Sequence, residues 1–427
     1  MTLQWKKTMP NHETVDAVVI GGGPSGSTVA TLLARQGLQV VLFERRSFPR
    51  FHIGESLLPA SLPILEELGV HEEVQKRFVR KPGGKWYYGE RPVFSNFADG
   101  PSGTSFDKTP WAYMVKRADF DDILLKNAAS SGARVLEGHT VVDVVQSGDR
   151  VTGVVVRDGS GATQEYHCDM VFDCSGYGAV IPKKFDLRRE NRLKRMAVFG
   201  HYRTVPLNED LKKGWFVGQM VYDGWIWLIP LEPDFISIGV VIPVEEYKKA
   251  QLSPQAFLER YMATTPIVPP SISANPQLEG KVHIYGNLGY TSSIAHGNGW
   301  VLVGDAAFFI DPCYSTGVHL ALTMAKEAVN LFLESRRPGK NESELFAEYE
   351  KTLRNDEKLV LRFVDAFYMA SRNRVLKRLV PLTLTERMNR TFVAVTGGDY
   401  TVQPWKINMV YYFSKIVTFL FPFRAQA

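Results

Sequence analysis

The sequence contains little cysteine, and this bounds the chemistry that the protein can use. Cys168, Cys174 and Cys313 are the only three cysteines in 427 residues, and no C-x-x-C pair is present. Three scattered thiols make no disulfide framework, so we expect a protein of the reducing cytoplasm. We also expect no metal site.

Long apolar runs and a strong charge imbalance are also missing. No run of 18 apolar residues is present and the first fifteen residues are polar, so we expect neither a transmembrane helix nor a signal peptide. A net charge of +5 argues against a nucleic-acid binder, although it would suit an anionic cofactor, substrate or partner. With 45% hydrophobic residues, the composition predicts two or three globular domains, or one large α/β domain with insertions.

A glycine-rich turn stands near the start of the chain, between an expected strand and an expected helix. The β-rich run at 15–20 leads into Gly21-Gly22-Gly23-Pro24-Ser25-Gly26, helical composition follows at 28–36, and the apolar run at 40–43 ends in Glu44. In such a βαβ unit the glycines permit a tight turn and close approach of a pyrophosphate, and the helix N-terminus offers amide groups to phosphates. A carboxylate at Glu44 can accept from ribose hydroxyls. The pattern therefore predicts a dinucleotide site.

Two later strand ends and one helix extend this pattern. A buried run ends in Asp173-Cys174-Ser175-Gly176, the run W-V-L-V ends in Gly304-Asp305, and Arg117 and Asp121 lie in V-K-R-A-D-F-D-D-I-L-L. In this order the segments resemble the p-hydroxybenzoate-hydroxylase-like FAD fold over about residues 15–335. The resemblance implies FAD as the cofactor, held by Gly21, Gly23, Pro24, Ser25, Gly26, Glu44, Arg45, Arg117, Asp173, Gly304, Asp305 and Pro312.

The expected fold class is α/β, or α+β taken as a whole. It comprises a Rossmann-like FAD-binding domain (1–80, 110–190 and 280–340), an inserted β-sheet substrate domain (81–109 and 191–279) and a helical C-terminal region (341–427). Alternating apolar patterns at about 196–300 predict the strands of the inserted sheet. No second glycine fingerprint marks a nicotinamide domain, so we expect a separate reductase to supply reduced FAD.

Further motifs narrow the family. The run from Trp225 to Pro230 reads W-x-W-x-I-P, G-E-S-L-L-P begins at Gly54, D-P-x-x-S-T-G-V-H-L-A begins at Asp311, and Lys81 precedes a glycine-containing turn. Together they resemble the flavin-dependent halogenases, especially the branch acting on phenolic and pyrrolic substrates, some of them held on carrier proteins. Taken alone, W-x-W predicts core packing, because alternate strand residues share a face.

The resemblance assigns roles to these residues. Reduced FAD and O2 would oxidise chloride or bromide, held by the amides of Thr316 and Gly317, to hypohalous acid. Trp225 and Trp227 would separate the substrate from the flavin, and Lys81 would direct the electrophile.

Each role has a structural alternative. The alternative to a halide site is simple helix capping by Ser315 or Thr316. The alternative for Lys81 is a solvated charge among basic neighbours. Lys85 would lie one turn from Lys81 if this segment were helical. The general base stays open among His52, His201, His296 and His319, of which His319 is interpreted as structural. The apolar run at 407–423 predicts a packing helix, a cover for the substrate pocket, or a partner- or membrane-surface helix.

The leading hypothesis is an FADH2-dependent halogenase of secondary (antibiotic) metabolism. Its expected substrate is a phenolic, tyrosine-like or pyrrole ring, free or tethered to an acidic carrier protein. Three rivals share the FAD segments: an oxygen-inserting monooxygenase, a saturase of the geranylgeranyl-reductase type, and a non-catalytic binding protein related to GDP-dissociation inhibitors. The intact glycine turn and Glu44 argue against the last of these.

Overall fold

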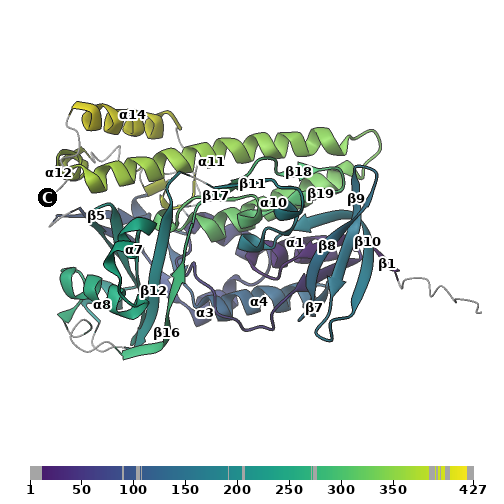
Figure 1. Cartoon of the computed structure of the whole chain (residues 1–427), viewed down its shortest axis with the longest axis horizontal. Coiled ribbons are helices and arrows are strands. Elements are labelled where there is room, and N and C mark those ends of the chain that lie inside the picture. Colours follow the sequence, from purple (N-terminus) through teal and green to yellow (C-terminus); the bar gives the residue numbers. More distant parts are fainter. Residues whose placement is uncertain are drawn as a thin grey trace, which may run out of the picture.

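Two β-sheets and a long C-terminal helix organise the chain (Figure 1). The structure is a computed structural model, and it describes residues 12–88, 91–101, 106, 108–190, 192–203, 207–270, 272, 277–383, 390, 393–394, 396–399 and 404–420.

The first sheet contains the expected βαβ unit. Its central strands β19, β10, β1, β2 and β7 run parallel, and helices α1 (Pro24–Arg35), α4 (Arg117–Ser130) and α10 (Thr316–Ser335) pack beside it. The strands in spatial order are β18 (His296–Gly297), β19 (Trp300–Leu302), β10 (Thr163–Asp173), β1 (His12–Ile20), β2 (Val40–Glu44) and β7 (Arg134–Glu137). An antiparallel meander of β8 (Thr140–Ser147) and β9 (Arg150–Arg157) pairs with the first part of β10.

The second sheet is largely antiparallel and is assembled from two separated parts of the chain. In spatial order its strands are β16 (Gln277–Tyr285), β12 (Arg195–Arg203), β15 (Phe235–Pro243), β14 (Gly224–Glu232), β13 (Phe216–Val221), β4 (Gly83–Tyr88) and β5 (Arg91–Asn96). Strand β16 spans position 279, where the expected substrate domain ends.

Both faces of the central strands β14 and β15 are buried, which explains their nearly continuous apolar sequences. Along β14, Trp225, Trp227 and Ile229 belong to the large core shared with the first sheet. Ile226 and Leu228 point the other way, into a separate core covered by α8 (Pro254–Thr264). The period of two residues thus places both indoles on the side that faces the first sheet.

The remaining elements are short, apart from those of the C-terminal region. Small sheets are formed by β3 (Val79–Lys81) with β6 (Ala112–Met114), and by β11 (Arg188–Glu190), β17 (Tyr290–Ser292) and β20 (Phe308–Phe309). The short helices are α2 (Leu62–Glu67), α3 (His71–Arg77), α5 (Val180–Lys184), α6 (Glu209–Lys212) and α7 (Val244–Ala250). Helix α11 (Glu342–Arg372) runs along the molecule, and α12 (Arg374–Thr383) and α14 (Pro404–Leu420) pack at its C-terminal end (Figure 1). Among the described helices, none is long and apolar enough to cross a bilayer.

Candidate functional site

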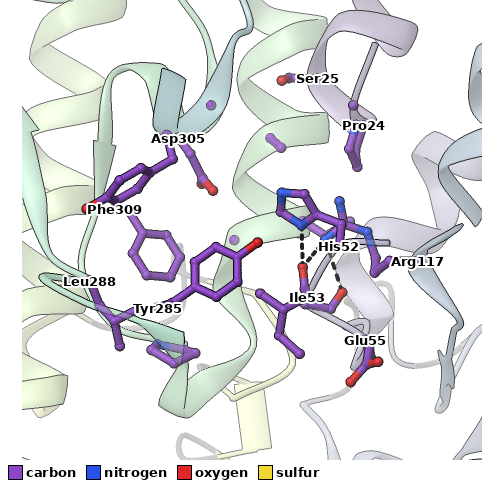
Figure 2. A pocket seen from close by; sticks show the side chains of 18 of the residues that line it. Pro24, Ser25, His52, Ile53, Glu55, Arg117, Tyr285, Leu288, Asp305 and Phe309 are labelled. Atoms are coloured by element: carbon purple, nitrogen blue, oxygen red, sulfur yellow. Dashed lines mark hydrogen bonds between the residues drawn. The ribbon is translucent and has the colours of Figure 1, made fainter. Parts of the chain in front are cut away.

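A cavity of about 490 Å³ lies between the two sheets, at the end of the glycine turn. Its wall comes from the loop after β1, the segment at 50–56, the start of α10 and the inner face of the second sheet. Figure 2 shows Pro24, His52 and Arg117 on one side of this space, and Asp305, Phe309, Leu288 and Tyr285 on the other.

The glycine turn is shaped by backbone contacts that leave no room for side chains. Gly21 has a φ of +101°, and an added Cβ would lie 2.6 Å from the carbonyl oxygen of Cys174. An added Cβ at Gly26 would lie 1.8 Å from the carbonyl oxygen of Gly21. Gly23 is the N-cap of α1 and brings no capping side chain, so the first amides of the helix are free to face an anion. This backbone cradle suits a pyrophosphate.

Glu44 stands where the sequence predicts a ribose ligand. Its side chain is buried at the end of β2 and lines the cavity, as do the exposed neighbours Arg45 and Arg46. The Glu44 carboxylate accepts from the Gly22 amide at 2.8 Å and from the Arg46 amide at 3.0 Å. Because two of its lone pairs are engaged, the carboxylate is fixed in place while further acceptor capacity remains.

Arg117 and Asp121 form a buried bidentate ion pair beneath the cavity. Arg117 Nε and Nη2 donate to the two Asp121 oxygens at 2.7 and 2.9 Å, and Nη1 donates to the Ile53 carbonyl at 2.5 Å. Arg50, which no sequence motif identified, also forms an ion pair with Asp121, with Nη1 at 3.2 Å from Oδ2, and lines the cavity. Burial, with Arg117 next to it, lowers the pKa of His52 to about 4, so this imidazole is neutral.

The two later strand ends serve different purposes. Asp173 is fully buried, and its carboxylate accepts from the Ser175 amide at 3.0 Å and the Ile181 amide at 2.7 Å. It does not line the cavity, so it shapes the Ser175–Gly178 turn that does. Asp305 does line the cavity, and burial raises the pKa of its carboxyl to about 7 against the opposing effect of Arg117. Gly304, with a φ of +65°, sits against Ala321 and Ser25.

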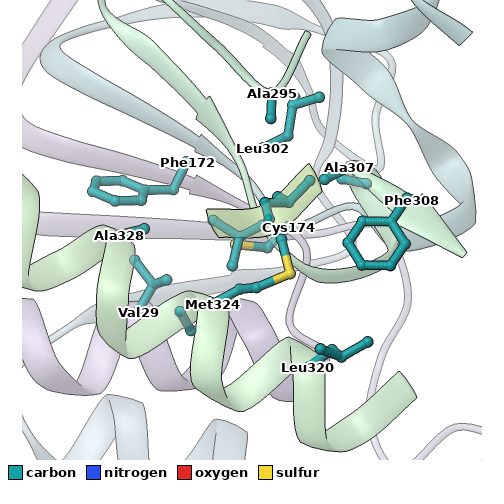
Figure 3. Close-up of a cluster of buried hydrophobic side chains, with 14 of the residues drawn as sticks. Val29, Phe172, Cys174, Ala295, Leu302, Ala307, Phe308, Leu320, Met324 and Ala328 are labelled. Carbon is teal, nitrogen blue, oxygen red and sulfur yellow. The ribbon is translucent and has the colours of Figure 1, made fainter. Parts of the chain in front are cut away.

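A core of buried apolar side chains packs against the Gly304–Ala306 turn. Figure 3 shows Cys174, Leu302, Ala307 and Met324 gathered between the sheet and α10. The Gly304–Ala306 turn and the start of α10 are therefore held by the same packed layer.

The N-terminus of α10 opens on the cavity. Pro312, Ser315 and Gly317 line the cavity, whereas Thr316 is buried outside the lining set. Ser315 is the N-cap with a φ of +58° and makes no side-chain cap hydrogen bond, so capping by its hydroxyl is not observed. An added Cβ at Gly317 would lie 3.9 Å from Asp305 Oδ1, which places the helix start beside a carboxyl that burial favours in its neutral form. A helix N-terminus without a side-chain cap, beside a carboxyl whose pKa is raised by burial, makes this a suitable anion site.

Trp225 and Trp227 form the wall on the side of the second sheet. Both line the cavity, and their ring centroids lie 5.4 Å apart. Trp227 Nε1 donates to Ser237 Oγ at 3.1 Å. Trp225 Nε1 donates to the Tyr368 hydroxyl at 3.1 Å, which in turn donates to Asp311 Oδ2 at 2.8 Å. Core packing and a role in the cavity are therefore compatible, since the indoles are buried and also border the space.

Lys81 is buried behind the cavity wall. Its Nζ donates to Ser56 Oγ at 2.8 Å and to the Leu57 carbonyl at 2.9 Å, and lies 5.0 Å from the Phe97 ring centroid. Burial lowers its pKa to about 7, and Ser56 stands between it and the cavity. Lys85 is on strand β4, not one helical turn away, and pairs with Asp210 at 2.5 Å. Of the two lysines, Lys81 alone is the buried one that contacts a residue of the cavity wall.

The four histidines occupy distinct environments. His201 Nε2 lies 2.5 Å from Oε1 of Glu55, a buried carboxylate of the cavity wall whose other oxygen has no hydrogen-bond partner in the described part of the chain. His319 is buried beside Ser61 and Gly398, and burial lowers its pKa to about 4, in keeping with a structural role. His296 pairs with Glu350 at 3.6 Å and does not line the cavity.

Several wall residues could not be predicted from the sequence. Glu55 belongs to the G-E-S-L-L-P motif, but nothing in the sequence pairs it with His201. Tyr285, Leu288 and Phe309 reach the cavity from β16, from the loop after β16 and from β20, and they belong to no recognised motif. Only the folded arrangement identifies them.

Comparison with known proteins agrees with this site. The profile of a family described as FAD binding domain matches residues 14–364. The chain is 34% identical over 360 residues to flavin-dependent halogenase armH3 of Armillaria mellea, which covers 78% of this chain and 70% of that protein. It is 36% identical over 319 residues to tryptophan 2-halogenase of Chondromyces crocatus, covering 72% of this chain but only 59% of that longer relative.

Solved structures give the same result. The myxobacterial chondrochloren halogenase CndH, described as an FAD-dependent halogenase, superposes with a TM-score of 0.77 at 30% identity, covering 95% of this chain and 97% of that one. The flavin-dependent halogenase CmlS superposes with a TM-score of 0.76 at 28% identity, covering 95% of this chain and 78% of that one.

Proposed function

The chain belongs to the flavin-dependent halogenase family, and we propose that it attaches chlorine or bromine to an electron-rich aromatic ring, using reduced FAD, O2 and halide. The proposed ring is phenolic, tyrosine-like or a pyrrole, either free or tethered to an acidic carrier protein. A chlorinase of Pseudomonas fluorescens named for a pyrrole-2-carbonyl group on a peptidyl-carrier protein is 29% identical over 387 residues, which supports this substrate class.

The observation that carries the proposal is the environment of Lys81. This side chain is 3% exposed, and its Nζ touches only neutral oxygens in the contacts described above. A desolvated ammonium gives up its proton near neutral pH, and its pKa of about 7 means that both forms are populated there. Such a group can hydrogen-bond to an oxidised halogen or accept it on nitrogen, which a lysine ion-paired to a carboxylate, such as Lys85, does poorly.

FAD would be held by the backbone cradle of Gly21, Gly23, Pro24, Ser25 and Gly26, by Glu44 and Arg45 at the ribose, and by Arg117, Asp305 and Pro312 further along the cavity. Asp173 and Gly304 would act indirectly, by shaping the two turns. When bound in its reduced form, the cofactor supplies the two electrons that activate O2 for oxidation of the halide.

The chain's own residues would then control the halide and the ring. The amides of Thr316 and Gly317 would hold the halide at the start of α10, where no capping side chain from Ser315 competes. Trp225 and Trp227 would fill the wall that an aromatic substrate must cross to reach the flavin directly. The Glu55–His201 pair would accept the proton released on substitution. Burial lowers the pKa of His52 and His319 to about 4 and makes them weak bases, and His296 does not line the cavity.

This assignment implies a place in secondary metabolism, with antibiotic biosynthesis the expected setting. We propose a separate flavin reductase as the source of reduced FAD. A cytoplasmic location would keep Cys168, Cys174 and Cys313, which are buried and unpaired, as thiols.

The proposal is tested by supplying the protein with FAD, a flavin reductase, NADH, O2 and chloride or bromide, and a panel of free and carrier-bound phenols and pyrroles. A product with the isotope doublet of chlorine or bromine supports halogenation. A gain of one oxygen that does not depend on halide would instead assign the chain to the monooxygenases, and reduction of an isoprenoid double bond would assign it to the saturases.

Lys81→Ala separates the lysine's role from cofactor binding. We expect halogenated product to fall at least about 100-fold, because positioned side chains typically contribute factors of this size. FAD oxidation should continue at the original rate. Lys85→Ala is the matched control and should retain full activity, since Lys85 pairs with Asp210 and does not line the cavity. Equal activity of both variants would contradict the assignment.

A further inference from the structure

The outer face of α14 carries an unusual concentration of exposed apolar side chains. Of the 14 large hydrophobic residues exposed in the described part of the chain, seven belong to this helix. Their spacing follows helical periodicity, so they form one continuous stripe. The stripe consists of Trp405, Met409, Tyr412, Phe413, Ile416, Phe419 and Leu420, with exposed fractions from 45% for Phe413 to 85% for Phe419.

The inner face of the same helix is already packed. Ile407 is buried with Leu359 against Phe363 of α11, and Arg362 Nη1 donates to Asn408 Oδ1 at 2.5 Å. Figure 1 shows α14 on the outside of α11, away from both sheets. The stripe is therefore the outer surface of a docked helix and cannot be buried by closer packing on α11.

Positive charge is concentrated in the same region. Residues 374–427 contain eight Lys or Arg and only two Asp or Glu, a net charge of +6, while the whole chain carries +5. Arg374 and Arg378 of α12, the helix that contacts α14, and Lys415 of α14 itself are exposed. A second copy would bring the same positive charge to the contact, so self-association is opposed. A surface that is both apolar and anionic is complementary to the stripe and to the positive charge.

We propose that α14 is an interfacial helix that binds the surface of a bilayer containing anionic lipid. Apolar and aromatic side chains on one side of a helix enter the boundary between headgroups and acyl chains, and nearby Lys and Arg are attracted to anionic headgroups. The helix would lie along the membrane without crossing it. This inference does not depend on halogenation.

The test is sedimentation of the full-length protein with vesicles of phosphatidylcholine alone or mixed with phosphatidylglycerol. We expect binding to the mixed vesicles that weakens as salt is raised. The triple variant Ile416→Ser, Phe419→Ser, Leu420→Ser should lower the partition coefficient at least about tenfold, because several exposed side chains lose their transfer energy. Replacing Arg374, Arg378 and Lys415 with Gln should remove the preference for anionic lipid.

Tyr222→Ser and Ile284→Ser are the matched controls. These residues are 56% and 41% exposed on the second sheet and should leave vesicle binding unchanged. Thermal unfolding and FAD absorbance should be the same in every variant, because all the changed side chains face outward. If mixed vesicles do not bind the protein, or bind the serine variant equally, the proposal fails.

Two further outcomes would also overturn it. Sedimentation velocity that shows a dimer, dissociated by the serine variant, would identify a second copy as the occupant of the stripe. Binding of an acidic carrier protein that the serine variant loses, without vesicle binding, would identify that partner instead.

Discussion

The two ends of the cavity are built from different materials. At the α1 end the shape is made by backbone, since Gly21 and Gly26 approach other main-chain atoms too closely for any side chain. At the second-sheet end it is made by side chains, with Trp225 and Trp227 from β14 in the wall and Lys81 from β3 behind it. Hydrogen bonds to Tyr368, Ser237 and Ser56, respectively, hold these side chains. Backbone requirements are local to a motif, whereas a side-chain wall exists only after the sheets have met. The two ends should therefore fail differently when changed.

Gly26→Val should have the largest effect. An added Cβ would already stand 1.8 Å from the Gly21 carbonyl oxygen, so α1 must move away from β1 and the phosphate cradle is lost. We expect FAD binding, measured by fluorescence titration, to be abolished. Gly23→Ala is the control for folding, because its nearest neighbour would be Arg50 Nη2 at 3.6 Å. Without FAD, Gly23→Ala should be as stable as the parent protein. Retention of FAD by Gly26→Val would contradict the conclusion that backbone contacts shape this end of the cavity.

Trp227→Ala tests the opposite end. Removing a buried indole should lower the free energy of unfolding by about 3–5 kcal/mol, and Ser237 would lose its donor. FAD should still bind, because the glycine cradle is untouched. Urea unfolding and FAD titration measure the two properties separately, and loss of FAD binding without loss of stability would show that the ends are not independent.

Asp305 lies where the two ends meet and makes stability depend on pH. Its folded pKa of about 7 exceeds its ordinary value of 3.8, so the folded state binds more protons between these values. The free energy of unfolding of the apoprotein should therefore fall as pH rises from about 4 to about 7, by at most about 4 kcal/mol from this group. Asp305→Asn should flatten that part of the profile. A profile identical to the parent protein would show that Asp305 does not carry this dependence.

Tyr368→Phe is the smallest change and sharpens the account of the side-chain end. It removes the hydroxyl that joins Trp225 to Asp311, leaving a buried donor and a buried carboxylate oxygen without this partner. We expect a loss of about 1–3 kcal/mol in chemical denaturation. Tyr349→Phe, which removes one hydrogen bond to the Leu302 carbonyl, should cost less. A larger loss of stability for Tyr349→Phe than for Tyr368→Phe would show that the Tyr368 hydroxyl does not hold the wall.

The same contrast explains what the sequence could predict. The βαβ unit and its glycine turn were predicted correctly because their residues are adjacent and their constraints are local. The sheet nature of the second domain followed from alternating apolar runs. That Asp173 braces a turn instead of lining the cavity could not be predicted, since its partners Ser175 and Ile181 are fixed only by the folded turn. The pairing of Glu55 with His201 spans 146 positions and left no local signal.

Helix α11 has a geometric consequence for the whole site. Glu342 near its start contacts Arg150 and the Gly299 amide beside the first sheet, Tyr368 reaches the Asp311 loop, and Arg372 pairs with Asp223 in the turn between β13 and β14. At 1.5 Å per residue this rod is about 46 Å long and acts as a spacer that sets the gap between the sheets. One residue inserted between Tyr349 and Tyr368 would rotate the later contacts by about 100° about the axis. In a chimaera with a relative, α11 must therefore be exchanged together with the Asp311 loop and the Asp223 turn, because its side chains contact both.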